Sequence, residues 1–378
     1  MMLNFEIPTK EIEKRRQLIR DVWNYKKVDH IPVMLQINSN PYGYTMHDEI
    51  FSREKQLQLR LASIKKTLEL VPDDYIPGIF VNMGCVGIEN ALGMEIYYGE
   101  SPQQTPGVRG RLLQNIEDIY KLKAIDPYKD GILPQFLERM RYFLEETGYR
   151  IPVSCLDMNG PMPIAMDIIG SEHLLLGMYE YPDDIKYLLN FTMENILRVT
   201  EACIEAADGL DNITCTDFCD YWFPEGKKGH VSDDVCAMYK PEMFEEFSIP
   251  VNNKIFDKYG PGTLHNCGPN PCVDYYLEHR PNISGVDLAY KYSKKDLPNF
   301  RKPFKGRGII YLGMIFNSHS EVLADYRYIM DSLAPDVIAI PSIYINESAI
   351  ASGECVPGRL YEDLRKMSEE YAAKMEWK

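Results

Sequence analysis

The chain has 378 residues, of which 45% are hydrophobic and 26% charged, with a formal net charge of −15. This negative charge repels phosphate backbones and argues against nucleic acid as a partner. No run approaches the roughly 20 apolar residues that a membrane-spanning helix needs, so no membrane partner is expected. The first residues lack the apolar segment of a signal peptide. Nine cysteines, an odd number, suit reduced thiols in the cytoplasm better than a disulfide framework.

Short apolar runs alternate with longer helical segments along the chain. Strands are expected at residues 31–36, 75–81, 151–157, 213–218, 262–267, 283–288, 308–314 and 336–342, each bounded by Gly, Pro, Asn or Asp. Helices are expected at residues 54–70, 131–147, 182–207, 240–258, 293–300, 319–332 and 358–376, with Pro250 kinking or splitting one of them.

This alternation predicts an α/β fold, and specifically a single (β/α)₈ TIM-type barrel over residues 1–378 with an N-terminal helical extension. Residues 83–130 are irregular and rich in Gly and Pro, and we interpret them as an insertion over the barrel mouth. A doubly wound open sheet is the alternative architecture.

The sharpest chemical motif is Leu264-His265-Asn266-Cys267-Gly268, at the end of an expected strand. Active sites of such barrels lie at the carboxyl ends of the strands. Residues two apart on a strand share a face, so His265 and Cys267 are placed to bind one cation, and zinc fits this ligand pair. A buried histidine beside an inert cysteine is the alternative. Either Cys272 or Cys355 could supply a third ligand.

Other candidate groups also lie near strand ends. Cys215 and Cys219 form a C-x₃-C pair with no nearby histidine in the sequence, which favours core thiols over a metal site. Carboxylates gather there too: Asp157, Asp217, Asp220, Asp233, Asp234 and Asp287. One of them could orient His265 or carry a proton, with Asp217, Asp234 and Asp287 as the candidates. For Asp234, helix capping by the Ser232–Asp234 segment is an equal alternative.

Six segments of the sequence carry a recognisable pattern: residues 156–161 (LDMNGP), 169–174 (IGSEHL), 181–182 (YP), 232–234 (SDD), 240–244 (KPEMF) and 265–268 (HNCG). In these segments, which extend over most of its length, the chain resembles the uroporphyrinogen decarboxylase superfamily. Proteins of this superfamily are single (β/α)₈ barrels, so the resemblance implies that fold.

Within the superfamily the chain is more similar to the zinc-dependent, corrinoid-linked methyltransferases. The decarboxylases grip substrate carboxylates with N-terminal arginines, and the matching residues 31–38 contain none. The methyltransferase branch holds zinc with a His-x-Cys pair and a distant C-terminal cysteine. Carried over by position, these ligands are His265, Cys267 and Cys355, so the resemblance favours Cys355 over Cys272.

The resemblance implies methyl transfer between a small molecule and the cobalamin of a separate corrinoid protein. The chain has no D-x-H-x-x-G signature of a corrinoid-binding domain, so the partner is expected to supply the cobalamin. The 26 tyrosines and the Tyr221-Trp222-Phe223 motif are consistent with an aromatic pocket, with structural aromatics or with a surface that meets the corrinoid protein. We favour O-demethylation of a methoxylated aromatic ether, with a methylcobalamin:thiol methyltransferase as the alternative. A homo-oligomer is compatible with either.

Two other functions stay open. A decarboxylase would need cations at the barrel mouth, and Arg109 and Arg111 of the insertion could serve. A barrel that merely binds a corrinoid or a metal would saturate zinc with a fourth protein ligand, for which Cys272 and Glu354 are candidates.

Overall fold

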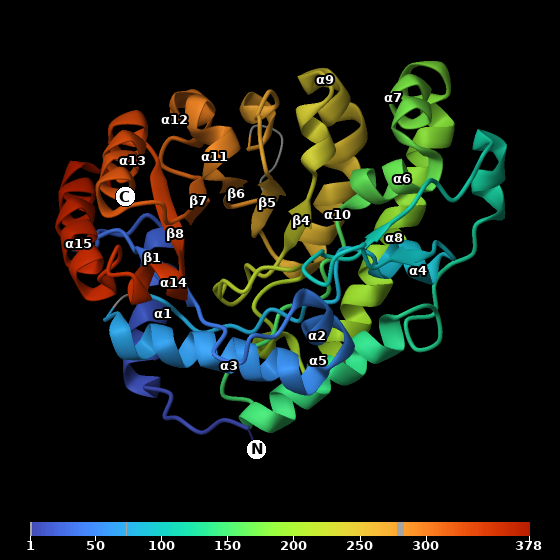
Figure 1. The fold of residues 1–378 in the computed structure, drawn as a ribbon. Coiled ribbons are helices and arrows are strands. Elements are labelled where there is room, and N and C mark those ends of the chain that lie inside the picture. Colours follow the sequence, from blue (N-terminus) through green and yellow to red (C-terminus); the bar gives the residue numbers. More distant parts are fainter. Residues whose placement is uncertain (1, 73, 278–282) are drawn as a thin grey trace. The chain divides into compact units, whose positions relative to one another are not determined.

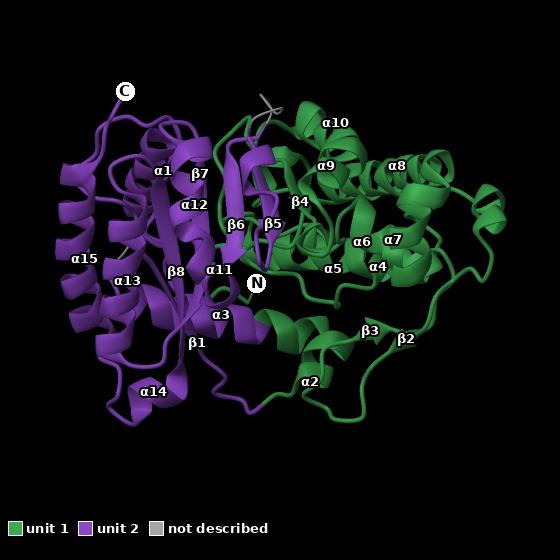
Figure 2. Cartoon of the chain, turned by 90° about the horizontal axis from the view of Figure 1, so that it is seen from above, with its two compact units in different colours: residues 1–3, 44–57, 78–261 green, residues 4–43, 58–77, 262–378 purple. Residues whose placement is uncertain are grey.

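The computed structural model describes residues 2–72, 74–277 and 283–378. The chain forms two compact units (Figure 2). Unit 1 comprises residues 1–3, 44–57 and 78–261, and unit 2 comprises residues 4–43, 58–77 and 262–378. The organisation of residues 1–378 as one barrel domain stays a prediction.

Unit 2 is built on a parallel sheet whose strands run in the order β1-β8-β7-β6-β5 (Figure 1). These strands are β1 (Met34–Asn38), β5 (Thr263–Asn266), β6 (Gly285–Ala289), β7 (Ile309–Ile315) and β8 (Ile338–Asn346). Its helices are α1 (Thr9–Trp23), most of α3 (Arg53–Leu70), α11 (Tyr290–Ser293), α12 (Leu297–Phe304), α13 (His319–Leu333), α14 (Glu347–Ala351) and α15 (Pro357–Lys374). α13 packs against β8, α12 and α15, so the helices cover the apolar strands.

Unit 1 is mainly helical. Its longer helices are α5 (Leu133–Thr147), α6 (Pro161–Ile169), α7 (Ser171–Glu180), α8 (Pro182–Ala206) and α10 (Ile249–Tyr259), and its shorter ones are α2 (Met46–Phe51), α4 (Gly87–Ala91) and α9 (Pro241–Met243). Its strands are β4 (His230–Ser232) and the antiparallel pair β2 (Ile96–Tyr97) and β3 (Gly107–Val108). Two parallel single-residue bridges, Ile79–Val153 and Val153–Ile213, join three further segments.

The structure confirms the α/β class and most expected elements, including the buried face of α8. The expected helix at 240–258 is split as Pro250 predicts, because a π-helical turn (Phe244–Ser248) separates α9 from α10. Residues 83–130 contain only α4, β2, β3 and a 3₁₀ turn at Ile116–Lys121, while their place over a barrel mouth stays a prediction.

Three expected strands, at 75–81, 151–157 and 213–218, were wrong in extent. Each is reduced to a single bridge residue. Side chains replace the missing ladder: the backbone N–H of Val81 donates to Ser154 Oγ at 3.0 Å, and that of Met158 donates to Asp217 Oδ1 at 3.1 Å. The backbone donors are therefore satisfied without a continuous strand pairing.

In the part of the chain that the structure describes, no helix has both the length and the apolar character needed to cross a bilayer.

Candidate functional site

His265 lies at the carboxyl end of β5, directly opposite Asp287 of β6 in the parallel register. The two side chains are 14% and 5% exposed, and His265 Nδ1 donates to Asp287 Oδ2 at 3.0 Å. A carboxylate on Nδ1 fixes the imidazole tautomer and ring orientation, which leaves the Nε2 lone pair available as a ligand.

Cys267 follows β5 directly and brings its thiol to that nitrogen. Cys267 Sγ is 3.4 Å from His265 Nε2. Zinc–sulfur and zinc–nitrogen bonds of about 2.3 and 2.05 Å at a tetrahedral angle place the two ligand atoms about 3.5 Å apart. The observed spacing therefore fits two ligands of one zinc ion.

The loop that carries Cys267 is fixed by its neighbours. Asn266 Nδ2 donates to the Pro269 carbonyl at 3.0 Å, and its Oδ1 accepts from the Gly268 N–H at 2.9 Å. Gly268 has a φ of +104°, and a side chain there would collide with Ser293. Glycine therefore lets the loop pass close to the end of α11 with Cys267 in place.

Cys355, the ligand expected from the resemblance, lies in the same unit between α14 and α15. It is buried, and its backbone N–H donates to the Ala349 carbonyl at 2.9 Å. Among the described residues, neither Cys355 nor Cys272 offers a ligand atom within 4.8 Å of both His265 and Cys267. The identity of the third ligand stays a prediction. Glu354 is exposed.

In unit 1, Asp217 is buried within a polar network. Its carboxylate accepts from Ser232 Oγ at 3.0 Å, from the Met158 N–H at 3.1 Å and from His230 Nδ1 at 3.3 Å. The other imidazole nitrogen, Nε2, is 3.2 Å from Cys219 Sγ. The expectation that the Cys215–Cys219 pair has no histidine nearby was therefore wrong. The three-residue strand β4 returns the chain to this loop, and such a short strand has no recognisable periodicity.

Asp234 is half-buried in unit 1 and begins a 3₁₀ turn, Asp234–Ala237. The turn has no side-chain capping hydrogen bond, so the capping interpretation of residues 232–234 was wrong. Asp233 is instead engaged by Asn252 Nδ2, at 3.1 Å. A catalytic role for Asp234 stays a prediction.

The aromatic motif at residues 221–223 is buried, with Tyr221, Trp222 and Phe223 at 7%, 5% and 0% exposure. It is not a surface for a protein partner. The Lys228 ammonium lies 5.5 Å from the Trp222 ring centroid, which agrees with the structural interpretation of these aromatics.

Glu89 in α4 is a buried carboxyl group that the sequence analysis missed. Burial, reinforced by the charge of Asp167, raises its pKa to about 8. Asn159 Nδ2 donates to Oε1 at 3.4 Å, while Oε2 has no hydrogen-bond partner among the described residues. The signal available in the sequence is a lone acidic residue within VGIENAL. Glu89 therefore holds a proton at neutral pH.

Glu89→Gln is expected to change how stability depends on pH. Between the ordinary pKa of 4.5 and the folded value of about 8, only the folded state keeps the proton, so wild-type stability falls as pH rises through this window. Glutamine cannot ionise. The free energy of unfolding of the variant should therefore rise relative to that of the wild type by about 1.4 kcal/mol per pH unit within this window. Urea denaturation at several pH values measures this slope. Glu95→Gln, at an exposed position, is the control, and equal slopes for Glu89→Gln and wild type would contradict the assignment.

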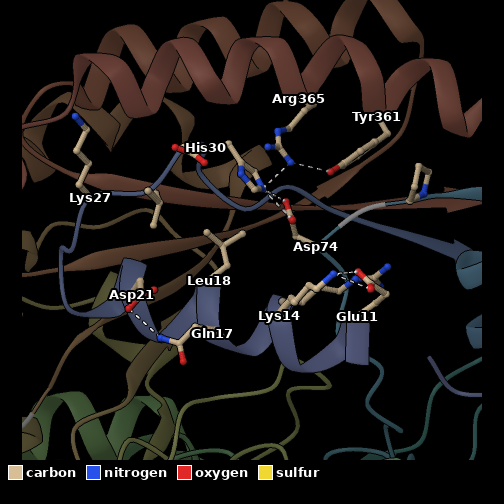
Figure 3. Close-up of a pocket in the computed structure, with 14 residues that line it drawn as sticks. Glu11, Lys14, Gln17, Leu18, Asp21, Lys27, His30, Asp74, Tyr361 and Arg365 are labelled. Atoms are coloured by element: carbon tan, nitrogen blue, oxygen red, sulfur yellow. Dashed lines mark hydrogen bonds and ion pairs between the residues drawn. The ribbon is translucent and has the colours of Figure 1, made fainter. Parts of the chain in front are cut away.

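A hollow in unit 2 has a volume of about 650 Å³ and is lined by α1, α15, the residues before β1 and the segment after α3 (Figure 3). His30 Nε2 is 2.9 Å from Asp74 Oδ1 and 3.0 Å from Arg365 Nη1. His30 precedes β1, Asp74 follows α3 and Arg365 lies on α15, away from the strand ends that carry chemistry in parallel sheets. We assign the His30–Asp74 pair to stability.

The arginines of the insertion already have partners. Arg111 Nη1 is 2.7 Å from His173 Nδ1, and Arg111 Nη2 donates to Gln114 Oε1 at 2.9 Å. The Arg109 guanidinium stacks on the Tyr97 ring at 3.4 Å. The structure thus shows neither arginine held ready for a substrate carboxylate.

Comparison with known proteins assigns the chain to a family. A search of curated proteins found no match. Among solved structures, a methyltransferase from Methanosarcina mazei is similar over 94% of this chain and 98% of its own, with a TM-score of 0.65 and 17% identity. A B12-independent methionine synthase from Shewanella sp. W3-18-1, in complex with selenomethionine, is similar over 91% of this chain and 96% of its own, with a TM-score of 0.46 and 12% identity. The first of these similarities establishes the fold. The family model for uroporphyrinogen decarboxylase (URO-D) matches residues 14–307. The chain belongs to the uroporphyrinogen decarboxylase family, whose fold is a TIM barrel.

Proposed function

We propose that this protein is a zinc-dependent methyltransferase that exchanges a methyl group between a small molecule and the cobalamin of a separate corrinoid protein. The observation that carries the proposal is the His265–Cys267 pair, whose ligand atoms are 3.4 Å apart at the carboxyl end of β5. The fold similarity to a protein described as a methyltransferase supports it.

The donor set suits zinc rather than a hard cation, because an imidazole nitrogen and a thiolate are its preferred ligands. His265 and Cys267 would hold the ion, and Cys355 is the proposed third ligand. Three protein ligands leave one position for substrate. When bound there, zinc supplies Lewis acidity, which lowers the pKa of a thiol or polarises the oxygen of an ether.

The protein residues supply position and charge. Asp287 holds the His265 ring with Nε2 facing Cys267 and is a positioning residue. The Asp217 carboxylate already accepts hydrogen bonds from His230 and Ser232, which makes it a weaker candidate for proton transfer than its position near a strand end suggested. Asp234, a half-buried carboxylate, is the residue that we propose for proton transfer with substrate.

The favoured substrate is a methoxylated aromatic ether, demethylated by transfer to cobalt(I). The test is an anaerobic incubation of the purified protein with cob(I)alamin and methoxylated aromatics, followed by the absorbance of methylcobalamin. A parallel incubation with methylcobalamin and small thiols tests the reverse chemistry. Activity only in the second assay would replace the demethylase with the thiol methyltransferase. If the protein is inactive in both assays but releases carbon dioxide from a porphyrinogen, the decarboxylase that the family description favours would replace the methyltransferase.

Asp287→Asn is expected to weaken zinc binding by about 10- to 100-fold, because an amide orients the His265 ring less well than a carboxylate. Competition with a chromophoric chelator measures the affinity. Asp325→Asn is a matched control, since Asp325 accepts from Tyr290 and Lys294 on the same unit. Unchanged zinc affinity in Asp287→Asn would show that the His265–Asp287 contact does not serve a metal.

A further inference from the structure

Unit 1 contains a second group of soft ligands that the proposed function does not use. The ligand atoms of Cys215, Cys219 and His230 all lie within 4.8 Å of one another, and all three residues are buried. His230 Nε2 is 3.2 Å from Cys219 Sγ, close to the spacing of about 3.5 Å expected for two ligands of one zinc ion.

The histidine is oriented as a metal ligand would be. His230 Nδ1 donates to Asp217 Oδ2 at 3.3 Å, so the lone pair is on Nε2, toward Cys219. Asp217 is itself held by Ser232 Oγ and by the Met158 N–H. This is the same carboxylate–histidine–cysteine sequence of contacts as Asp287, His265 and Cys267.

The backbone that carries these ligands is tied together on both sides. The Thr216 N–H donates to the Lys228 carbonyl at 2.9 Å, and the His230 N–H donates to Thr216 Oγ1 at 2.8 Å. The buried Lys228 ammonium donates to the Ile213 carbonyl at 2.8 Å. These bonds hold the C-x₃-C loop against β4, so little backbone order has to be gained on binding an ion.

Two phenylalanine rings lie against the imidazole of the cluster. The rings of Phe218 and Phe223 lie 5.4 and 6.0 Å from the His230 ring, and Phe223 is fully buried. A buried cation needs nearby negative charge, and two thiolates neutralise a divalent ion.

We propose that Cys215, Cys219 and His230 hold a second zinc ion, which fastens the loop of residues 215–219 to β4 within unit 1. Binding releases the two thiol protons to solvent and involves no change in oxidation state. Three protein ligands leave the fourth position to a water molecule. The inference does not depend on the proposed methyl transfer.

Elemental analysis of the purified chain tests both sites separately. About two zinc ions per chain are expected in the wild type, about one in Cys267→Ser, about one in Cys219→Ser and none in the double variant. Cys236→Ser, at another buried cysteine of unit 1, is the matched control and should keep both ions. One ion in the wild type that disappears in Cys267→Ser would overturn the second site while leaving the first intact.

The Cys267→Ser protein gives a test that does not require the cluster variants to fold. Cobalt(II) exchanged into it should show intense thiolate-to-cobalt charge transfer, and a chelator should lower its melting temperature. Absence of bound metal would overturn the proposal. So would a disulfide between Cys215 and Cys219, which would leave the number of titratable thiols in denaturant two below the expected number. A folded Cys267→Ser protein that also carries Cys219→Ser and His230→Ala, and still binds one ion, would overturn the proposal as well.

Discussion

His265→Ala is expected to remove about one zinc ion per chain and to lower the rate of methyl transfer by about 10³-fold or more. The substitution deletes the ligand nitrogen 3.4 Å from Cys267 Sγ and leaves the Asp287 carboxylate buried without its imidazole partner. A single thiolate and one distant cysteine cannot hold the ion at the affinity of a three-ligand site. Elemental analysis and the cobalamin assay measure the two effects.

The matched control is His319→Ala. His319 on α13 also faces a carboxylate, with Nε2 3.1 Å from Asp363 Oδ2, but it lies outside the candidate site. Zinc content and rate should stay at wild-type values. Methyl transfer that survives in His265→Ala at the rate of His319→Ala would refute the role of this histidine.

Arg139→Met is expected to lower the free energy of unfolding by about 3 kcal/mol. The Arg139 guanidinium is buried in unit 1 and donates to the carbonyls of Glu49 and Ile50, at 3.1 and 2.8 Å. These are carbonyls of the last turn of α2, where a cation also balances the helix dipole. Burial lowers the pKa of Arg139 to about 10, which still leaves it charged at neutral pH. Methionine fills part of the volume but leaves the carbonyls without these donors.

Arg141→Met separates this effect from a general cost of losing a charge on α5, because Arg141 is exposed on the same helix. Urea denaturation of the three proteins gives the comparison. A loss in Arg141→Met as large as in Arg139→Met would show that the carbonyl contacts are not the cause.

Local periodicity was sufficient to predict most of the helices. The buried face of α8, including Leu188, Met193 and Val199, follows directly from the 3.6-residue repeat. The expected strands at 75–81 and 151–157 were too long because Ser154, through its hydroxyl, takes the Val81 N–H that a ladder would have used. That hydrogen bond joins residues 73 positions apart, and no local sequence pattern predicts it.

The part of the site that could be predicted consists of the ligands that lie close together in the sequence. His265 and Cys267 follow from the spacing of two residues, whereas Asp287 is one of six carboxylates near strand ends and is distinguished only by the β5–β6 register. His230 was missed because β4 is three residues long. Glu89 was missed because burial of a carboxyl group depends on tertiary packing rather than on neighbours in the sequence.

The most direct test is the zinc dependence of methyl transfer to cob(I)alamin. Protein stripped with a chelator should lose its activity and regain it on adding zinc, while His265→Ala should gain nothing from the added metal. Stripped, metal-free protein that methylates cob(I)alamin at the wild-type rate would contradict a zinc centre at His265 and Cys267.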